Sequence, residues 1–228
     1  MKIRKHPIIY HSSYNIPLPE RHRFSGTKYS LLLQYLEDIG LTQNFLKYTP
    51  KPCTAENLSI AHKASYIKEI QTGNLSKENQ TRLGLPWSEI LRKRSFIAPN
   101  GTLLAAQLAL QTGVACHAAG GTHHAHWDFG AGFCVFNDLA YTARALIKMG
   151  LARKVLILDC DVHQGDGTAN ILSNDSNILT CSIHCAENYP AKKAASDLDF
   201  SISKGSGDDG YLAVWGRCLS QRDRSNIA

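Results

Sequence analysis

The chain has 228 residues, of which 43% are hydrophobic and 19% are charged, and its formal net charge is +6. This length and composition indicate a soluble protein with a sizeable buried core, and they exclude a disordered or low-complexity chain. The longest apolar stretches, at residues 103–110 and 155–158, are far shorter than the roughly 20 residues of a membrane helix. We therefore expect no membrane span.

The charged and sulfur-containing residues indicate the partners and the compartment. Only two basic clusters occur, at residues 21–23 and 92–94, and without interleaved aromatics they are typical of solvated surface rather than of a nucleic-acid site. The seven cysteines include no Cys-x-x-Cys pair, so we interpret them as reduced thiols. Residues 1–10 lack the apolar run of a secretory signal. We expect a protein of the nucleus or cytoplasm that binds neither nucleic acid nor membranes directly.

The first half of the chain predicts one strand followed by helices. Residues 8–10 resemble a short strand, and residues 29–39 place leucines and isoleucine at helical spacing before a glycine. A second helix is expected at residues 65–71. Pro99, Asn100 and Gly101 then predict a break between two further helices, at residues 88–94 and 103–111.

From residue 114 the pattern alternates between strands and helices. Strands are expected at residues 114–117, 155–158 and 178–183, and helices at residues 138–149 and 168–172. Strands that are apolar throughout predict a parallel sheet with helices on both faces, which is an α/β fold. In such folds ligands bind beyond the carboxyl ends of the strands.

The first polar cluster lies directly after the strand expected at residues 114–117. Its sequence, GGTHHAH at residues 120–126, combines two glycines that allow a tight turn with the adjacent imidazoles of His123 and His124. The two imidazoles could serve one site. The alternative is a surface loop that happens to be rich in histidine.

The second polar cluster, LDCDVHQGDG at residues 158–167, follows the most apolar strand. Asp159, Asp161 and His163 are spaced two apart, so an extended backbone would project them to the same side. Carboxylates and neutral imidazoles are ligands of divalent ions such as zinc, and a further carboxylate can orient an imidazole. The alternative is a loop whose aspartates, such as Asp166, cap the next helix.

Taken together, these segments resemble the histone deacetylase family. The resemblance rests on the histidine pair, the Asp-x-Asp-x-His run, the Gly-Asp-Gly turn and the segment GAGFCVFND at residues 130–138. The wording GGTHHAH, with NYP at residues 188–190 and SDLD at residues 196–199, is most similar to the class IV-like branch of bacteria and plants. The resemblance implies an arginase/deacetylase-like fold.

The resemblance implies a zinc site. Asp161 and His163 match two of the family's zinc ligands, and the metal would activate water and polarise an amide carbonyl. Ser182, with carbonyl groups near residues 159–163, matches a structural potassium site of some relatives.

The resemblance also implies how protons move. His123 and His124 match the family's tandem histidines, one of which accepts a proton and later donates one to the leaving amine. Asp159 and Asp166 match the carboxylates that brace these imidazoles.

Two aromatic residues match the walls of a narrow channel for an acyl-lysine side chain. They are Phe133 and Tyr189, and the alternative is that both are ordinary core aromatics. The expected partner is thus an acylated lysine of a histone or another protein.

The family pattern breaks near the C-terminus. The family's third zinc ligand, an aspartate, and its oxyanion-stabilising tyrosine lie downstream of the segment that matches residues 178–199, and neither is found here. We therefore expect a C-terminally truncated domain at residues 1–212, with an incomplete sheet, and a divergent tail at residues 213–228 without a family helix. Losing one oxyanion donor typically costs about 10²- to 10³-fold in rate, so activity is expected to be impaired.

Three functions remain open from the sequence. The first is removal of acetyl or other acyl groups from protein lysines, and the second is hydrolysis of an acetylated polyamine or a similar small amide. The third is a catalytically silent interaction module. A dimanganese ureohydrolase of the arginase type uses further aspartates where this chain has the pair His123 and His124, which argues against it.

Overall fold

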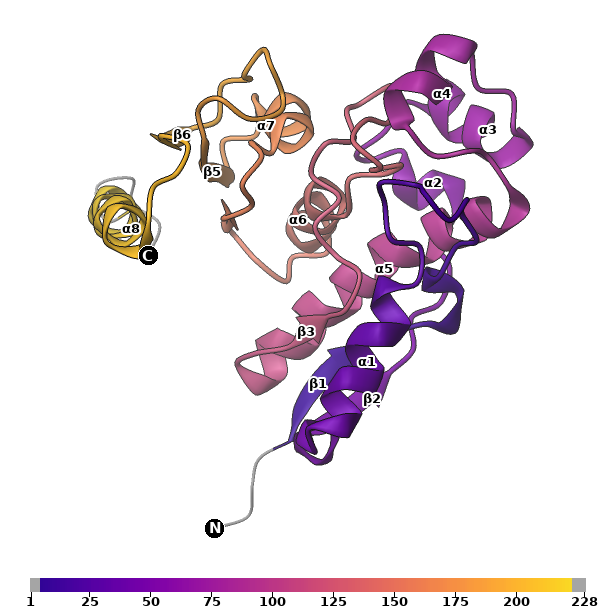
Figure 1. The fold of residues 1–228 in the computed structure, drawn as a ribbon, viewed down its shortest axis with the longest axis horizontal. Helices are drawn as coiled ribbons and strands as arrows, with labels where there is room; N and C mark the ends of the chain where they lie inside the picture. Colours follow the sequence, from indigo (N-terminus) through magenta and orange to yellow (C-terminus); the bar gives the residue numbers. More distant parts are fainter. Residues whose placement is uncertain (1–4, 223–228) are drawn as a thin grey trace. The chain divides into compact units, whose positions relative to one another are not determined.

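The structure is a computed structural model that describes residues 5–222, with side chains to residue 220, and is drawn in Figure 1. The chain forms two compact units, Met1–Ala145 and Leu146–Ala228, which are called unit 1 and unit 2 below. Each unit contains its own three-stranded parallel sheet. The expected α/β architecture with parallel strands is confirmed, although the described strands form two sheets instead of one.

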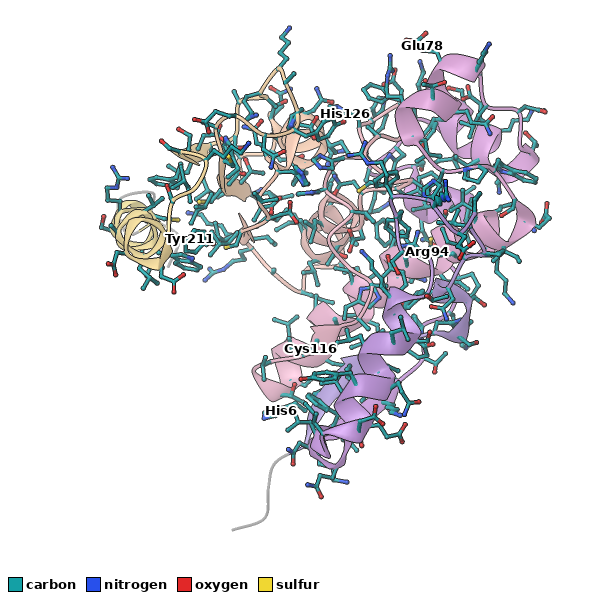
Figure 2. All side chains as sticks on the ribbon, viewed as in Figure 1. His6, Glu78, Arg94, Cys116, His126 and Tyr211 are labelled. Carbon is teal, nitrogen blue, oxygen red and sulfur yellow. The ribbon has the colours of Figure 1, made fainter. Side chains whose placement is uncertain are left out.

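The sheet of unit 1 has the strand order β2-β1-β3. Strand β1 (His6–Ile9) lies in the centre and pairs in parallel with β2 (Phe45–Tyr48) and β3 (Cys116–His117). Figure 2 labels His6 on β1 and Cys116 on β3. Ile8 and Ile9 of β1 are buried, which explains why the sequence predicts this strand, whereas β2 is mostly exposed and was not expected.

Glycines follow several helices of unit 1. Gly40 follows α1 and Gly73 follows α3, both with positive φ, as their positions after the expected helices indicated. The shorter helical elements of unit 1 are η1 (Ser12–Tyr14), α1 (Lys28–Asp38), η2 (Leu41–Asn44), α2 (Ala55–Leu58), α3 (Ala64–Thr72) and α4 (Lys77–Leu83).

The long helix α5 (Glu89–Thr112) corrects the expectation of two helices with a break at Pro99. Proline removes one backbone donor but does not end a helix whose neighbours satisfy the disturbed turn. Here the backbone N–H and the thiol of Cys53 donate to the Phe96 carbonyl, at 2.7 and 2.8 Å. The Asn100 side chain also accepts a hydrogen bond from a tyrosine hydroxyl at 2.8 Å. Distant segments thus form hydrogen bonds with α5 on both sides of Pro99, and the helix continues through this residue.

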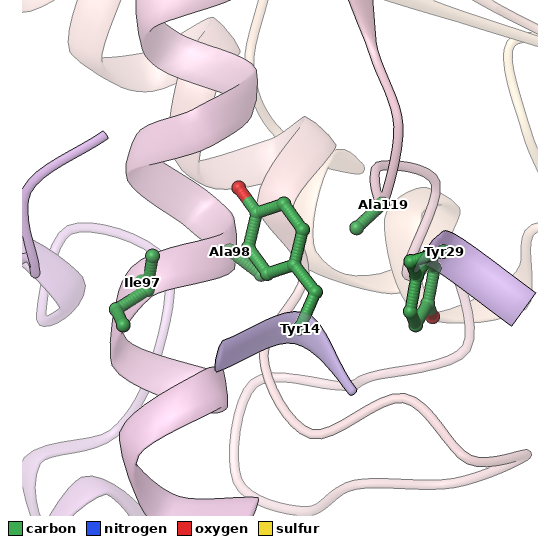
Figure 3. Close-up of a cluster of buried hydrophobic side chains, with 5 residues drawn as sticks. All are labelled: Tyr14, Tyr29, Ile97, Ala98 and Ala119. Atoms are coloured by element: carbon green, nitrogen blue, oxygen red, sulfur yellow. The ribbon is translucent and has the colours of Figure 1, made fainter. Parts of the chain in front are cut away.

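A buried cluster connects α5 to the first part of the chain. Tyr14 lies between Ile97 and Ala98 of α5 on one side and Tyr29 and Ala119 on the other, as Figure 3 shows. The rings of Tyr14 and Tyr29 meet edge to face, with centroids 6.0 Å apart. Because Ala119 immediately precedes the glycine-histidine segment, this cluster anchors that segment to the core.

Helix α6 (Asp138–Lys148) lies where the sequence predicts a helix, and it begins in unit 1. Unit 2 contains the second sheet. Strand β5 (Ile178–Cys185) lies between β4 (Val155–Asp159) and β6 (Leu198–Ile202), all parallel. Helix α7 (Asp166–Leu172) connects β4 to β5. The sequence predicted β4, α7 and β5 but not β6.

The last described element of unit 2 is helix α8 (Asp208–Arg222), so the expectation that residues 213–222 would not be helical is wrong. Val214 and Cys218 on this helix are buried against Cys181 and Ile183 of β5. Burial on one face stabilises a helix whose sequence shows only weak periodicity. Residues 223–228 of the expected tail lie outside the described residues, and the domain boundary at residue 212 stays a prediction.

Within residues 5–222, none of the helices combines the length and the apolarity that crossing a membrane requires.

Candidate functional site

The histidine loop, residues 118–126, follows β3 and places two imidazoles in a buried position. His123 is 6% exposed and His124 is 4% exposed. Their ring centroids are 4.1 Å apart at an interplanar angle of 43°. The alternative of an exposed histidine-rich loop is therefore wrong for these two side chains. Two adjacent buried imidazoles are suited to moving protons at one reaction centre.

The segment at residues 130–138 packs against this loop. A Cβ atom added to Gly132 would lie 2.6 Å from Cδ2 of His124, so the close approach of backbone and imidazole requires glycine at this position. The next residue, Phe133, has φ of 68°, the one positive φ outside glycine among the described residues. A bulky residue in this conformation is strained.

The ring of Phe133 is half-buried. It lies 5.7 Å from the ring of His22 and 5.5 Å from that of Phe24, centroid to centroid. Its backbone N–H donates to the Leu83 carbonyl at 2.9 Å. Aromatic neighbours from residues 22–24 thus hold a strained backbone in place, and the role of Phe133 as a channel wall stays a prediction.

A buried carboxylate at the start of α6 holds the histidine loop. The Asp138 carboxylate accepts hydrogen bonds from the backbone N–H groups of Gly121 at 3.0 Å and Thr122 at 2.7 Å. It also accepts from the hydroxyls of Thr122, at 2.5 Å, and of Thr102. A fully buried carboxylate is stable only with such donors.

Neutral histidines support the same region. His117 on β3 has Nε2 at 2.7 Å from the Tyr14 hydroxyl and Nδ1 at 2.8 Å from the Thr102 hydroxyl. Burial lowers its pKa to about 4, although the nearby Asp138 carboxylate opposes this effect. His117 is therefore a neutral imidazole at physiological pH, and it orients the threonine that contacts Asp138.

His62 has a similar role on the other side of the loop. Its Nδ1 lies 2.9 Å from the His126 carbonyl, and its Nε2 accepts the backbone N–H of Asn137 at 2.8 Å. The residue is completely buried, and burial lowers its pKa to about 4. Sequence reasoning missed His62, Asn137 and Asp138 as loop supports, because their partners are far away in the sequence.

The carboxylate turn, residues 159–163, follows β4 in unit 2. Oδ1 of Asp159 accepts the backbone N–H of Asp161 at 3.0 Å, and Oδ1 of Asp161 accepts the backbone N–H of His163 at 2.8 Å. Nδ1 of His163 also lies 3.0 Å from Oδ1 of Asp161. Residues 161–163 form a bend instead of the extended backbone that the spacing of two assumed, and these hydrogen bonds link the three residues within the turn.

The other predicted residues of unit 2 lie on neighbouring elements. The ring of Tyr189, which is 42% exposed, meets that of His163 edge to face at 6.1 Å between centroids. Asp166 is the first residue of α7 and is buried. Ser182 is buried on β5, where its hydroxyl lies 3.0 Å from Nδ1 of His184.

The predicted site residues thus fall into two groups, one in each unit. His123, His124 and Phe133 belong to unit 1, and Asp159, Asp161, His163, Asp166, Ser182 and Tyr189 belong to unit 2. Across residues 5–222, no group of three or more His, Cys, Asp or Glu side chains is gathered in a way that could hold a metal ion. Asp161 and His163 supply two donors of the kinds that zinc binds.

Comparisons with known proteins identify the family and agree with the fold. The family model of the histone deacetylase domain matches residues 22–222. The chain therefore belongs to the histone deacetylase family. It is 45% identical over 208 residues to an uncharacterized protein of Picosynechococcus sp., and 26% identical over 236 residues to histone deacetylase 2 of Arabidopsis thaliana.

Among solved structures, the chain resembles an acetylpolyamine aminohydrolase from Burkholderia pseudomallei, with a TM-score of 0.77. The identity is 18%, so this likeness concerns the fold alone, and it covers 97% of the present chain and 79% of that structure. The alignments cover 91% of the chain and 69% of the cyanobacterial relative, and 98% of the chain and 61% of the plant relative. The present chain thus spans about two thirds of the relatives' length.

Proposed function

We propose that the chain belongs to a zinc-dependent hydrolase that removes acetyl or other acyl groups from lysine side chains of histones or other proteins. The observation that carries the proposal is the buried contact between His123 and His124 in a member of this family. Proton transfer by a positioned imidazole contributes about 10²- to 10⁴-fold to such reactions.

Asp161 and His163 are the residues proposed to hold the metal. The carboxylate and the imidazole nitrogen already face each other at 3.0 Å, and both are partly exposed, with side-chain exposures of 50% and 38%. Zinc, when bound, supplies Lewis-acid activation of an amide carbonyl and of water. Catalytic zinc sites take three protein ligands, and Asp161 and His163 supply two of them. Until a third is supplied, we expect weak metal binding and slow turnover.

The histidine loop is proposed to transfer the proton. One imidazole of the pair accepts a proton from the attacking water and later donates a proton to the departing lysine amine. Asp159 and Asp166 are the carboxylates proposed to brace these imidazoles. Asp159 also organises the carboxylate turn through its hydrogen bond with the backbone of Asp161.

Two aromatics are proposed to wall the path of the acyl-lysine side chain. Tyr189 supports this role because its exposed ring adjoins His163, one of the two proposed zinc ligands. Phe133 supports it because a strained backbone conformation persists most often where function requires it.

Ser182 is proposed to contribute to a structural potassium site. A small cavity of about 10 Å³ is lined by Asp159, Thr180, Ser182 and neighbouring residues of β4, β5 and α7. Such a volume is close to the minimum that a cavity needs in order to hold one particle of the size of a water molecule.

The test is to express the 228-residue chain, titrate it with zinc by calorimetry, and assay an acetyl-lysine peptide against an acetylated polyamine. We expect zinc binding and slow hydrolysis of the peptide, and loss of hydrolysis in His124→Ala with zinc binding retained. His126→Ala is the matched control, because its ring stacks on Phe129 at 4.4 Å and is not one of the proposed pair.

Three results would contradict the proposal in different ways. Faster hydrolysis of the acetylated polyamine than of the peptide would indicate that the substrate is a small amide and not a protein lysine. Zinc binding without turnover of either compound would indicate an interaction module that works by binding. A chain that binds no zinc would overturn the assignment of Asp161 and His163.

A further inference from the structure

The dipeptide Asn137-Asp138 binds the backbone of the histidine loop at residues 121, 122, 123 and 125. The two residues are fully buried, with exposed fractions of 0% each. As described above, the Asp138 carboxylate accepts the N–H groups of residues 121 and 122 and the Thr122 hydroxyl. These bonds fix the backbone immediately before His123.

Asn137 fixes the backbone on the other side of the first imidazole. Its Nδ2 donates to the carbonyl groups of His123 at 3.4 Å and Ala125 at 3.1 Å. Its Oδ1 accepts the N–H of Ala140 at 2.9 Å, which caps the first turn of α6. The side-chain amide of Asn137 therefore caps the start of α6 and holds the histidine loop at the same time.

Helix capping alone does not explain Asp138. An acidic residue in the first turn commonly stabilises a helix through its dipole, without partners elsewhere. Here the hydrogen-bond partners of the carboxylate are Thr102, Gly121 and Thr122, and all three lie outside α6. The carboxylate is directed away from its own helix and toward the histidine loop.

The Thr122 hydroxyl joins the histidine loop to residues 136 and 138, both as a donor and as an acceptor of hydrogen bonds. Its hydroxyl lies 2.6 Å from the Phe136 carbonyl and 2.5 Å from the Asp138 carboxylate, and it accepts the backbone N–H of Asp138 at 3.1 Å. The loop is also confined sterically, because a Cβ atom on Gly120 would lie 3.1 Å from the carboxylate. The loop and the start of α6 therefore form one interlocked unit.

We propose that Asn137 and Asp138 are positioning residues that orient the imidazoles of His123 and His124 by fixing the backbone of residues 121–125. The catalytic consequence rests on the proposed function, whereas the structural consequence does not. A displacement of about 1 Å at a reacting group can cost about 10²-fold in rate. Loosening the backbone is therefore expected to slow turnover without weakening the binding of substrate.

The experiment compares Asp138→Asn, Thr122→Val and Thr122→Ser in the full 228-residue chain. Thr122→Val keeps the side-chain shape and removes the hydroxyl, whereas Thr122→Ser keeps the hydroxyl and is the matched control. The first measurement is amide hydrogen exchange. We expect exchange at residues 121 and 122 to become at least about 10-fold faster in Asp138→Asn and Thr122→Val, with buried amides of α5 such as Ile97 unchanged.

The second measurement is steady-state kinetics with the acetyl-lysine peptide. We expect kcat to fall by about 10- to 100-fold with KM nearly unchanged in Asp138→Asn and Thr122→Val, and Thr122→Ser to retain most of the activity. If Asp138→Asn does not fold, the Thr122 pair decides the question.

Unchanged exchange at residues 121 and 122 would overturn the proposal, as would equal loss of activity in Thr122→Ser and Thr122→Val. A rise in KM with unchanged kcat would also overturn it, because substrate binding would then be affected in place of proton transfer. If the unsubstituted chain hydrolyses neither acetylated compound, the proposed function fails, and the exchange measurement still decides whether the dipeptide fixes the loop.

Discussion

The histidine loop and the carboxylate turn differ in how their geometry is maintained. The imidazoles of the loop are about 5% exposed, and its backbone is fixed by buried side chains from other elements. The turn is held by hydrogen bonds among its own residues and by one from the backbone N–H of Cys185 on β5 to the Val162 carbonyl, at 2.9 Å. The side chains of Asp161 and His163 are 50% and 38% exposed. The proposed proton-transfer groups are thus enclosed by the protein core, whereas the proposed metal ligands lie on a more exposed turn.

The largest effect that would sharpen this comparison is expected for Asp161→Ala. Removing one of two assigned donors should lower zinc affinity by about 100-fold or more, because the remaining imidazole binds the ion alone. Zinc titration calorimetry measures the change. The circular dichroism spectrum should stay the same, since the residue is exposed.

Asp209→Asn is the control for Asp161→Ala, because it removes a negative charge from an exposed position on α8. It should leave zinc affinity unchanged. Equal losses in the two variants would mean that overall charge, and not ligation, determines the affinity.

The second prediction concerns pH and the support of the histidine loop by His62. Burial lowers the pKa of His62 to about 4 in the folded protein, from the ordinary value of 6.5 that we expect in the unfolded chain. The unfolded chain therefore binds a proton that the folded chain does not, and stability is lost as the pH falls from 6.5 through 4. The loss is about 3 kcal/mol for this residue.

Chemical denaturation at pH 7 and pH 4.5 measures this dependence. His62→Gln should show a shallower change of the free energy of unfolding with pH, because the titrating group is gone. Parallel curves for the variant and the unsubstituted chain would show that folding does not shift the pKa of His62.

The smallest expected quantity is the difference between two glycine variants, which separates backbone strain from packing against His124. Gly132→Ala introduces a methyl group at positive φ and against the imidazole. Gly40→Ala has a similarly positive φ, but its methyl group would have no neighbour within 4 Å. Gly40→Ala should destabilise by about 1 to 2 kcal/mol, and Gly132→Ala by a further ~1 to 3 kcal/mol.

Thermal or denaturant unfolding of the two glycine variants gives the difference. Equal destabilisation would indicate that His124 moves aside readily, and the histidine loop would then be less rigid than its hydrogen bonds suggest.

Local patterns in the sequence predicted much of the fold. Continuous apolar runs identified β4 and β5, and the glycines after α1 and α3 marked the helix ends. The continuous α5 could not be predicted, because no local pattern shows the tertiary contacts around Pro99, such as the bond from Cys53 to Phe96, 43 residues apart. Helix α8 was missed since it is stabilised by burial against β5.

In the candidate site, too, features set by neighbouring residues were predictable from the sequence, whereas contacts between distant residues were not. Residue types and a spacing of two identified Asp159, Asp161 and His163 as candidates. In the structure the two carboxylates accept backbone N–H groups within the turn, and the roles of the three residues stay predictions. An asparagine before an expected helix could have identified Asn137 as a cap. Its bonds to the histidine loop, and those of Asp138, depend on a tertiary arrangement that no local pattern contains.

The hydrogen bonds from Tyr14 through His117 and Thr102 to Asp138 also bear on the order of folding. The first of these bonds joins residues 103 positions apart, and the last joins residues 36 positions apart. Contacts at such sequence separations form late, because the chain must close long loops before it gains their interaction energy. During synthesis the imidazole pair therefore reaches its final arrangement only after residue 138 has left the ribosome and the amino-terminal segment has docked.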